Sequence, residues 1–326
     1  MKAMVYTKYG MTDVLKLEEV ETPAPKENEV LIQVYAASVN SWDWDRLRGK
    51  PFITRLEGLL KPRYKILGAD IAGRVVAVGG EVKLLQPGDE VFGDISGYGW
   101  GGFAEYTCAH EKAFTRKPAG MTFEEAAAIP QAAVLALQGL RDKGQIRKGH
   151  KVLINGAGGG VGTFAVQFAK SIGAEVTGVD SAAKLNMLQS IGANYVIDYT
   201  KDDFTKKGQL YDLILDVVGN RSVFEYKRAL KPKGTYVMVG GPMSRIFQVL
   251  LLGPFVSMIE KKNMGLLIHK PNKDDQNALK ELFEAGKIVP VIDRRYPLSD
   301  VAQAIQYLGE GHPKGKVIVR IEHEEN

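Results

Sequence analysis

A glycine-rich turn between a short strand and a helix constrains this chain more than any other feature. Residues 155–162 read Asn-Gly-Ala-Gly-Gly-Gly-Val-Gly, follow the apolar segment Val152–Ile154 and open a helical pattern over Gly162–Ser171. Such a turn lets backbone N–H groups approach a pyrophosphate, and the helix N-terminus adds partial positive charge. The pattern alone is weak, since Val161 occupies the strict third glycine position, and a glycine-rich turn without a ligand is the alternative. From its context we predict dinucleotide binding, with pyrophosphate contacts at Gly158, Gly159, Gly160 and Val161.

Strands and helices alternate along the residues that follow this turn. Expected strands lie at Glu175–Asp180, Tyr195–Ile197, Tyr211–Val217 and Thr235–Val239, with helices at Ala182–Ile191 and Val223–Leu230 between them. The continuous apolar run that begins at Tyr211 suits a strand buried on both faces. Strand–helix repetition of this length predicts an α/β fold with a doubly wound parallel sheet.

The chain before the glycine turn has a different character. Segments such as Glu29–Tyr35 and Ala72–Val78 carry β-branched residues between turn signals, which is typical of a small β-barrel. Residues 123–140 are rich in Ala and Leu around Pro130 and predict two short helices or one kinked helix. After Lys270 we expect helices at residues 274–285 and 299–308 and a last strand at 316–321 that suits the barrel. The predicted domains are therefore 1–122 with 286–326, and 123–285.

Composition removes several classes of function. The only cysteine, Cys108, excludes an intramolecular disulfide and fits a reducing compartment. The formal charge of +5 comes without a basic cluster, so we expect no nucleic-acid partner. The most apolar stretch, Ile246–Ile259, is shorter than the about 20 residues that span a bilayer, and we expect Gly253-Pro254 to interrupt it. We expect a soluble cytoplasmic protein without a membrane partner, in which this stretch is an interface, a lid or a buried loop.

Several motifs, taken in order, resemble the medium-chain dehydrogenase/reductase superfamily in its zinc-independent, quinone oxidoreductase-like branch. They are Gly68-Ala-Asp70, Gly88-Asp-Glu-Val-Phe-Gly93, Ala126-Ala-Ala-Ile-Pro130, Ala157-Gly-Gly-Gly-Val-Gly162 with Ala165-Val-Gln167, and His312-Pro-Lys-Gly-Lys316. The resemblance implies a GroES-like β-barrel catalytic domain, a Rossmann cofactor domain, a C-terminal segment that returns to the barrel, and a homodimer.

The same resemblance bears on zinc. Two positions that hold zinc ligands in zinc alcohol dehydrogenases fall at Asn40 and Ala69, and Cys108 with His110 supplies at most two ligands. Catalytic zinc needs three protein ligands, so we predict no metal. Oxidising a plain alcohol without a Lewis acid is difficult, whereas an electron-poor acceptor accepts hydride more readily. The resemblance implies hydride transfer from NAD(P)H to a quinone or an α,β-unsaturated carbonyl compound. The alternative is an NAD(P)-binding regulatory or interaction protein with little turnover.

Further site residues follow from strand ends and from the resemblance. Asp180 suits the ribose 2′-hydroxyl of NADH, whereas Ser181, Lys184 and Tyr199 suit a 2′-phosphate, so we expect both NADH and NADPH to be used. Asn40 resembles the family asparagine beside the nicotinamide, where it would position nicotinamide and substrate. The other candidates are Val217 and Val239 at strand ends, the cofactor loop His312, Pro313 and Lys314, and the substrate-pocket aromatics Trp42, Tyr64, Tyr98 and Trp100. Leu135 replaces a threonine that is common in the family, and no proton donor can be named.

Overall fold

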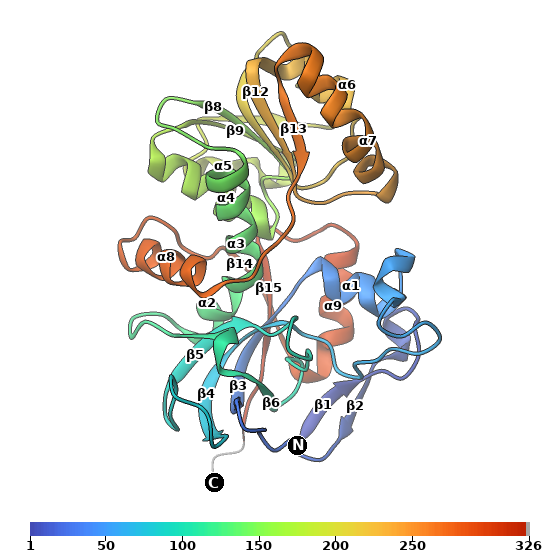
Figure 1. The fold of residues 1–326 in the computed structure, drawn as a ribbon, viewed down its shortest axis with the longest axis vertical. Helices are drawn as coiled ribbons and strands as arrows, with labels where there is room; N and C mark the ends of the chain where they lie inside the picture. Colours follow the sequence, from blue (N-terminus) through green and yellow to red (C-terminus); the bar gives the residue numbers. More distant parts are fainter. Residues whose placement is uncertain (324–326) are drawn as a thin grey trace. The chain divides into compact units, whose positions relative to one another are not determined.

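The computed structural model describes residues 1–323 and divides the chain into two compact units (Figure 1). The first unit comprises residues 1–131, 271–284 and 292 onward, and the second comprises residues 132–270 and 285–291.

The first unit is built mainly from β-strands. Its strands are β1 (Lys2–Val5), β2 (Lys16–Glu19), β3 (Glu29–Val39), β4 (Asp70–Val78), β5 (Glu90–Asp94), β6 (Tyr106–His110), β7 (Phe114–Arg116), β14 (Ile292–Pro297) and β15 (Lys316–Arg320). The main sheet has the order β14-β15-β3-β4-β5-β7, with β6 paired to β3, and β1 pairs with β2 separately. Strand β3 is central because Val30, Ile32 and Val34 alternate into the core, the period of two that a half-buried strand requires. The predicted β-rich domain and its C-terminal strand are confirmed, since β15 pairs antiparallel with β3.

Helices of the first unit pack around this sheet. They are α1 (Ser41–Arg48), α2 (Phe123–Ala128), α8 (Lys273–Glu284) and α9 (Val301–Gly309). Helix α1 follows β3 directly: Asn40 is its N-cap, and the Asp43 carboxylate accepts a hydrogen bond from the Asn40 N–H at 2.8 Å. The helix ends at Gly49, whose φ of 60° lies in the left-handed region that glycine adopts without strain. These caps fix where α1 begins and ends.

The unit boundaries differ from the predicted domain boundaries in three segments. Residues 123–131 and 271–284 belong to the first unit, although the sequence prediction placed them in the second. Helix α2 packs on β3, β4 and β5, and α8 packs on β7, where the Thr115 hydroxyl donates to the Gln276 side chain at 3.0 Å. Both helices pack on strands of the first unit. Residues 286–291, which the sequence prediction placed in the first domain, belong to the second unit.

The second unit is a doubly wound parallel sheet, as predicted. Its strands are β8 (Lys151–Asn155), β9 (Glu175–Asp180), β10 (Tyr195–Asp198), β11 (Tyr211–Asp216), β12 (Leu230–Met238) and β13 (Asn263–Leu266), in the order β10-β9-β8-β11-β12-β13. All neighbouring pairs are parallel. Its helices are α3 (Pro130–Leu137), which begins at the boundary, α4 (Gly160–Ile172), α5 (Leu185–Ser190), α6 (Val223–Ala229) and α7 (Met243–Glu260). From β8, the next strands along the chain lie on one side of the sheet (β9 and β10), and the later ones lie on the other side (β11 to β13). Sheets of this kind bind ligands at the carboxyl ends of the strands, beside the point between β8 and β11 where the order switches.

The apolar stretch at residues 246–259 lies within an uninterrupted helix, α7, with Pro254 inside it. Val249 and Val256 are buried, whereas most other side chains of α7 are exposed. The alternative of a buried loop is therefore wrong. Helix α7 is the one helix of residues 1–323 that is long and apolar enough to cross a membrane by length and composition alone.

Candidate functional site

The glycine-rich turn joins β8 to α4 at the carboxyl end of the parallel sheet. Gly156 has a φ of 80°, and its N–H donates to the Val179 carbonyl of β9 at 3.0 Å. A Cβ at Gly162 would lie 2.2 Å from the Gly156 carbonyl oxygen. Only glycine therefore fits at this close approach of the helix to the turn. Gly159 is the N-cap of α4 and makes no side-chain cap, which leaves the first N–H groups of the helix available to an anion. This geometry fits a pyrophosphate.

Asp180 lies at the end of β9 and reaches back to this turn. One carboxylate oxygen accepts from the Gly158 N–H at 2.8 Å, and the other accepts from the Ser181 N–H at 2.9 Å. The Lys184 ammonium lies 3.4 Å from the second oxygen, and both charged side chains are about nine-tenths buried. A Cβ at Gly158 would lie within 3.0 Å of both side chains. The structure thus brings the turn, Asp180 and Lys184 into one contact.

The other predicted cofactor residues of this unit lie along the same sheet edge. Ser181 follows β9, and Tyr199, which is half exposed, follows β10 and donates its N–H to the Asp180 carbonyl at 3.2 Å. Val217 follows β11 and Val239 follows β12, each with its N–H bonded to the neighbouring strand. Their arrangement at the carboxyl ends agrees with the prediction, and their contacts to a cofactor remain predictions.

A buried polar network supports this edge and escaped the sequence prediction. The Asp216 carboxylate, fully buried at the end of β11, accepts from the Asn155 amide at 2.9 Å and from the Tyr236 hydroxyl at 2.8 Å. It also accepts from the Gly219 N–H at 2.9 Å, which fixes the turn after β11. Burial beside Asp216 raises the pKa of Tyr236, so its hydroxyl stays protonated as a donor. Asp216 therefore positions two turns that flank the switch point of the sheet.

In the first unit, Asn40 lies in a buried cluster of charged side chains. Its Oδ1 accepts from the Lys316 ammonium at 2.5 Å, and its Nδ2 donates to Asp70 at 3.0 Å. The Lys316 ammonium is 3.8 Å from Asp70, and neither side chain is more than 3% exposed. The Gln131 N–H also donates to Asp70 at 3.2 Å. Both ends of the Asn40 amide are thus held, which fixes its orientation.

Burial controls the charges of this cluster. It raises the pKa of Asp70 and lowers the pKa of Lys316, and their mutual attraction opposes both shifts. Burial also raises the pKa of Asp43 to about 6, although the Asn40 and Gly68 N–H groups donate to its carboxylate. One oxygen of Asp70 and one of Asp94 are buried without a hydrogen-bond partner. The ammonium of Lys316 is therefore the cation that this acidic cluster surrounds.

The residues at the family's zinc positions do not form a metal site. Asn40 is engaged by Lys316 and Asp70, and Ala69 offers no ligand atom. Among residues 1–323, no three His, Cys, Asp or Glu side chains gather in a group that could hold a metal ion. The thiol of Cys108 has its pKa raised to about 11 by burial, and His110 accepts the Lys112 N–H through Nδ1. The donor set that zinc chemistry requires is not assembled there.

Three of the four predicted substrate-pocket aromatics surround one arginine. The Arg46 guanidinium lies 5.9 Å from the Trp42 ring centre, 5.8 Å from that of Tyr64 and 4.5 Å from that of Trp100. Arg46 also pairs with Glu57 at 2.6 Å. Trp100 is buried with a φ of 63°, whereas Trp42 is 53% exposed and available to a ligand. Arg46 organises this aromatic cluster and was not predicted.

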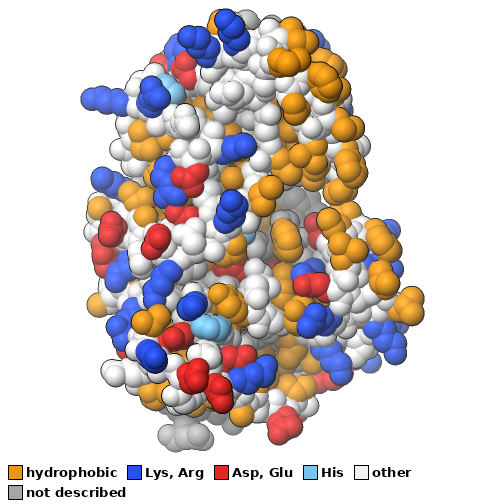
Figure 2. Space-filling view, in the orientation of Figure 1, with side chains coloured by type: hydrophobic (Ala, Val, Ile, Leu, Met, Phe, Trp, Pro, Cys, Tyr) orange, Lys and Arg blue, Asp and Glu red, His pale blue; other side chains and the backbone are white. Residues whose placement is uncertain are grey.

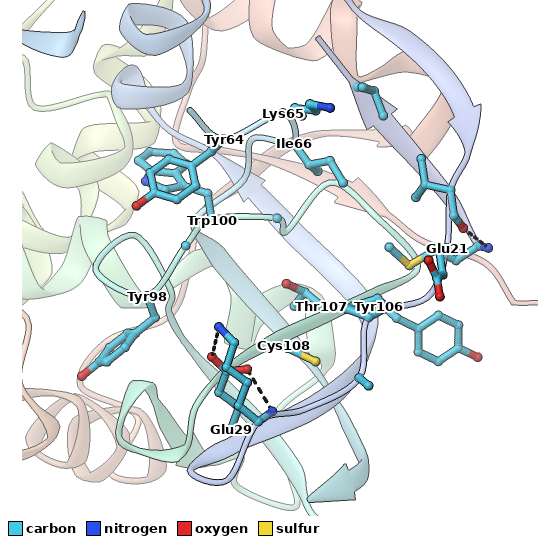
Figure 3. A pocket seen from close by; sticks show the side chains of 18 of the residues that line it. Glu21, Glu29, Tyr64, Lys65, Ile66, Tyr98, Trp100, Tyr106, Thr107 and Cys108 are labelled. Carbon is cyan, nitrogen blue, oxygen red and sulfur yellow. Dashed lines mark hydrogen bonds and ion pairs between the residues drawn. The ribbon is translucent and has the colours of Figure 1, made fainter. Parts of the chain in front are cut away.

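Tyr98, the fourth predicted aromatic residue, lines a pocket of about 630 Å³ in the first unit (Figure 3). Tyr64, Trp100 and Cys108 line the same pocket. The ring of Tyr98 is tilted against that of His110, with centres 5.7 Å apart. Tyr64, Tyr98 and Trp100 thus share the lining of one pocket, and their contact with a substrate remains a prediction.

The predicted C-terminal cofactor loop is anchored within the first unit. The Lys314 N–H donates to the Asp293 carboxylate at 3.0 Å, and the His312 imidazole lies 3.3 Å from Glu310. His312 and Lys314 are exposed, whereas Pro313 is buried. The role of these residues toward a cofactor remains a prediction.

Two protein-family models match the chain. An alcohol dehydrogenase GroES-like domain matches residues 26–119, and a zinc-binding dehydrogenase domain matches residues 191–319. The first match lies in the β-rich unit, and the second begins before β10 and ends in β15. These matches agree with the predicted GroES-like and Rossmann architecture.

Similar proteins match over almost the whole chain. The 2-methylene-furan-3-one reductase of Solanum lycopersicum is 36% identical, over 98% of this chain and 79% of its own length. The chloroplastic NADPH-dependent alkenal/one oxidoreductase of Arabidopsis thaliana is 34% identical, with the same coverage of both chains. Among solved structures, the quinone oxidoreductase from Coxiella burnetii superposes with a TM-score of 0.88 at 29% identity, covering 99% of each chain.

Proposed function

Because this chain belongs to the medium-chain dehydrogenase/reductase superfamily, we propose that it is an NAD(P)H-dependent reductase of quinones or α,β-unsaturated carbonyl compounds. One observation carries the proposal: the glycine turn, Asp180 and the free N-terminus of α4 meet at the switch point of a parallel sheet. Similar proteins named for alkenal and quinone reduction support the substrate class.

The residues of the second unit fit a nicotinamide dinucleotide. Gly158, Gly159, Gly160 and Val161 would hold the pyrophosphate, and Ser181, Lys184 and Tyr199 would surround the adenosine ribose. When bound, NAD(P)H supplies the hydride. The ion pair of Lys184 with Asp180 supports the use of both cofactors, because the lysine offsets the charge that would repel a 2′-phosphate. Val217 and Val239 would contact the cofactor along the sheet edge.

We propose that the reaction proceeds without zinc. The Lys316 ammonium lies within 4 Å of both Asn40 and Asp70, and a divalent cation at Asn40 would meet this buried positive charge. Asn40 then acts through its amide, whose orientation is fixed by Lys316 and Asp70.

The exposed face of Trp42 supports an apolar substrate. Arg46 holds the aromatic cluster of Trp42, Tyr64 and Trp100, and rigid rings suit a planar acceptor. We propose that this cluster and Tyr98 form a wall of the substrate pocket, and that His312, Pro313 and Lys314 contact the cofactor. The cytoplasmic location and the homodimer also belong to the proposal, and light scattering tests the second.

A substrate panel tests the proposed function. Purified protein is assayed for NADPH and NADH oxidation with 9,10-phenanthrenequinone, with an alkenal and with a plain ketone of matched size. We expect turnover with the first two and little with the ketone. Cofactor binding without turnover on any acceptor would favour the NAD(P)-binding regulatory protein instead.

A further inference from the structure

The segment that follows α1 carries large apolar side chains on the outside of the first unit. Each of them is more than half exposed, and they are Phe52, Ile53, Leu56, Leu59 and Leu60. In Figure 2, hydrophobic side chains gather where Figure 1 draws this segment, and Lys and Arg side chains lie beside them. A contiguous patch of this kind marks an interaction surface, whereas single exposed apolar residues do not.

Charged side chains of the same segment are engaged within the first unit. The Arg55 guanidinium donates from Nε to the Gly49 carbonyl at 2.9 Å and lies 4.6 Å from the ring centre of Tyr9. The Glu57 carboxylate pairs with Arg46 at 2.6 Å. The segment therefore turns its apolar side chains to solvent while charged ones anchor it, which is the reverse of what a surface that meets only water requires.

Positive charge accompanies the apolar patch. Residues 50–65 contain five Lys or Arg and one acidic residue, whereas the remainder of the chain contains 38 basic and 37 acidic residues. Four of the five units of formal charge are therefore carried by this segment. Its one acid, Glu57, is paired with Arg46. In the part of the chain that the structure describes, no ion pair engages the five basic side chains, which are Lys50, Arg55, Lys61, Arg63 and Lys65.

Three exposed lysines border the patch. Lys50 precedes the apolar residues, and Lys61 and Lys65 follow them. Lysine is depleted from protein–protein interfaces, whereas basic side chains beside exposed apolar ones are typical of surfaces that lie against anionic membranes. A second copy of this chain would bring the same positive segment to both sides of a two-fold contact, which its charge disfavours. The combination of charge and apolar surface therefore favours an anionic lipid bilayer as the partner.

We propose that residues 50–65 bind the surface of bilayers that contain anionic lipids. The apolar side chains lie at the boundary between headgroups and acyl chains, and the lysines contact lipid phosphates. This surface contact departs from the expectation, drawn from the sequence, that the protein has no membrane partner, because a folded surface segment needs no spanning helix to meet a bilayer. The inference does not depend on the proposed reductase activity.

Vesicle flotation of the full chain tests the proposal. We expect binding to vesicles of phosphatidylcholine with 30% phosphatidylglycerol to be at least about tenfold tighter than to phosphatidylcholine alone, and to weaken at 0.5 M salt. Leu56→Gln/Leu60→Gln should weaken binding to anionic vesicles at least about tenfold without changing the charge. Leu17→Gln/Leu84→Gln is its matched control, because both leucines are exposed in the first unit outside the segment, and it should bind as the wild type does.

A second pair of variants tests the lysines. Lys61→Gln/Lys65→Gln should weaken binding to anionic vesicles about tenfold and reduce its dependence on salt. Lys16→Gln/Lys112→Gln removes the same charge from exposed positions of the first unit and should change binding little. Equal losses in the two double variants would show that net charge, rather than this segment, attracts the protein, and would overturn the proposal.

A direct readout of depth completes the test. A tryptophan introduced by Leu60→Trp should be quenched by brominated acyl chains in anionic vesicles beyond the quenching of the wild type. One introduced by Leu84→Trp should add no such quenching. Wild-type protein that stays unbound to anionic vesicles would overturn the proposal.

Two other uses of the patch give different results. If Leu56→Gln/Leu60→Gln binds vesicles normally but converts a dimer to a monomer in light scattering, the patch serves a second copy. If it binds vesicles normally but raises the KM for a soluble acceptor, the segment covers the substrate. Either result would overturn the proposal. NAD(P)H oxidation with that acceptor, measured on the wild type, keeps a failure of membrane binding separate from a failure of the proposed function.

Discussion

The Asp180 carboxylate accepts a hydrogen bond from the backbone N–H of Gly158 across 2.8 Å, which joins the end of β9 to the glycine turn. The acidic group that would meet a ribose is therefore already held by the turn that would meet the pyrophosphate. The Lys184 ammonium, 3.4 Å from the same carboxylate, adds an opposing charge. The cofactor preference of the protein should depend on this pair.

Replacing either member of the pair should shift the preference in opposite directions. In the wild type we expect kcat/KM values for NADH and NADPH within roughly thirtyfold, or about 2 kcal/mol, because the two charges oppose each other. Asp180→Ser should shift the ratio toward NADPH, and Lys184→Ala should shift it toward NADH. Steady-state kinetics with both cofactors gives the ratio. An unchanged ratio in Asp180→Ser would mean that Asp180 does not face the ribose.

Gly160→Asp should weaken cofactor binding while leaving the fold intact. Gly160 begins α4, and an aspartate there places a side chain and a negative charge where the pyrophosphate would lie. We expect at least about tenfold weaker NADPH binding, or roughly 1.4 kcal/mol. Fluorescence titration measures the affinity, and circular dichroism checks the fold. Wild-type affinity in a folded variant would show that the phosphates bind elsewhere.

Chelation should not affect the enzyme. Asn40 and Ala69 occupy the positions of two zinc ligands, and Lys316 places a buried positive charge beside Asn40. After treatment with EDTA we expect full reductase activity, and elemental analysis should find no stoichiometric zinc. Activity that returns only when zinc is added would refute the zinc-free proposal.

Lys316→Met should destabilise the first unit and be rescued by a second change. Removing the ammonium takes away a hydrogen bond to Asn40 and leaves Asp70 buried without its cation, at a cost of about 3 kcal/mol. Adding Asp70→Asn removes the unpaired charge and should restore at least about 1 kcal/mol. Urea denaturation of the two variants and of Asp70→Asn completes the double-mutant cycle. Strictly additive effects would show that the two side chains are not coupled.

The sequence predicted well those features that neighbouring residues determine. The strand at residues 175–180 agrees with β9, and the helix at 162–171 lies within α4, because apolar periodicity and glycine positions are local signals. The turn itself could be located for the same reason. The assignment of Asn40, Asp180 and the other residues to contacts with a cofactor goes beyond that, and it stays a prediction.

Long-range contacts could not be predicted in this way. Lys316 and Asn40 are separated by 276 positions, and nothing near either residue indicates that they meet. Nothing in the sequence distinguishes Arg46 from the other arginines, because the three aromatic rings surround it only in the folded chain. Gly253 and Pro254 suggested an interruption, but packing of α7 against β13 keeps the helix continuous. In each case the structure depends on a tertiary contact that the local sequence pattern does not determine.

Transfer of deuterium from the cofactor tests the central claim most directly. NADPH that carries deuterium at C4 of the nicotinamide is mixed with the protein and an α,β-unsaturated ketone, and the product is analysed by mass spectrometry and NMR. The account predicts one deuterium at the β-carbon of the saturated ketone, formed by the wild type and lost in Gly160→Asp. A protein that binds NADPH but returns both cofactor and ketone unchanged, with quinones as well, would contradict it.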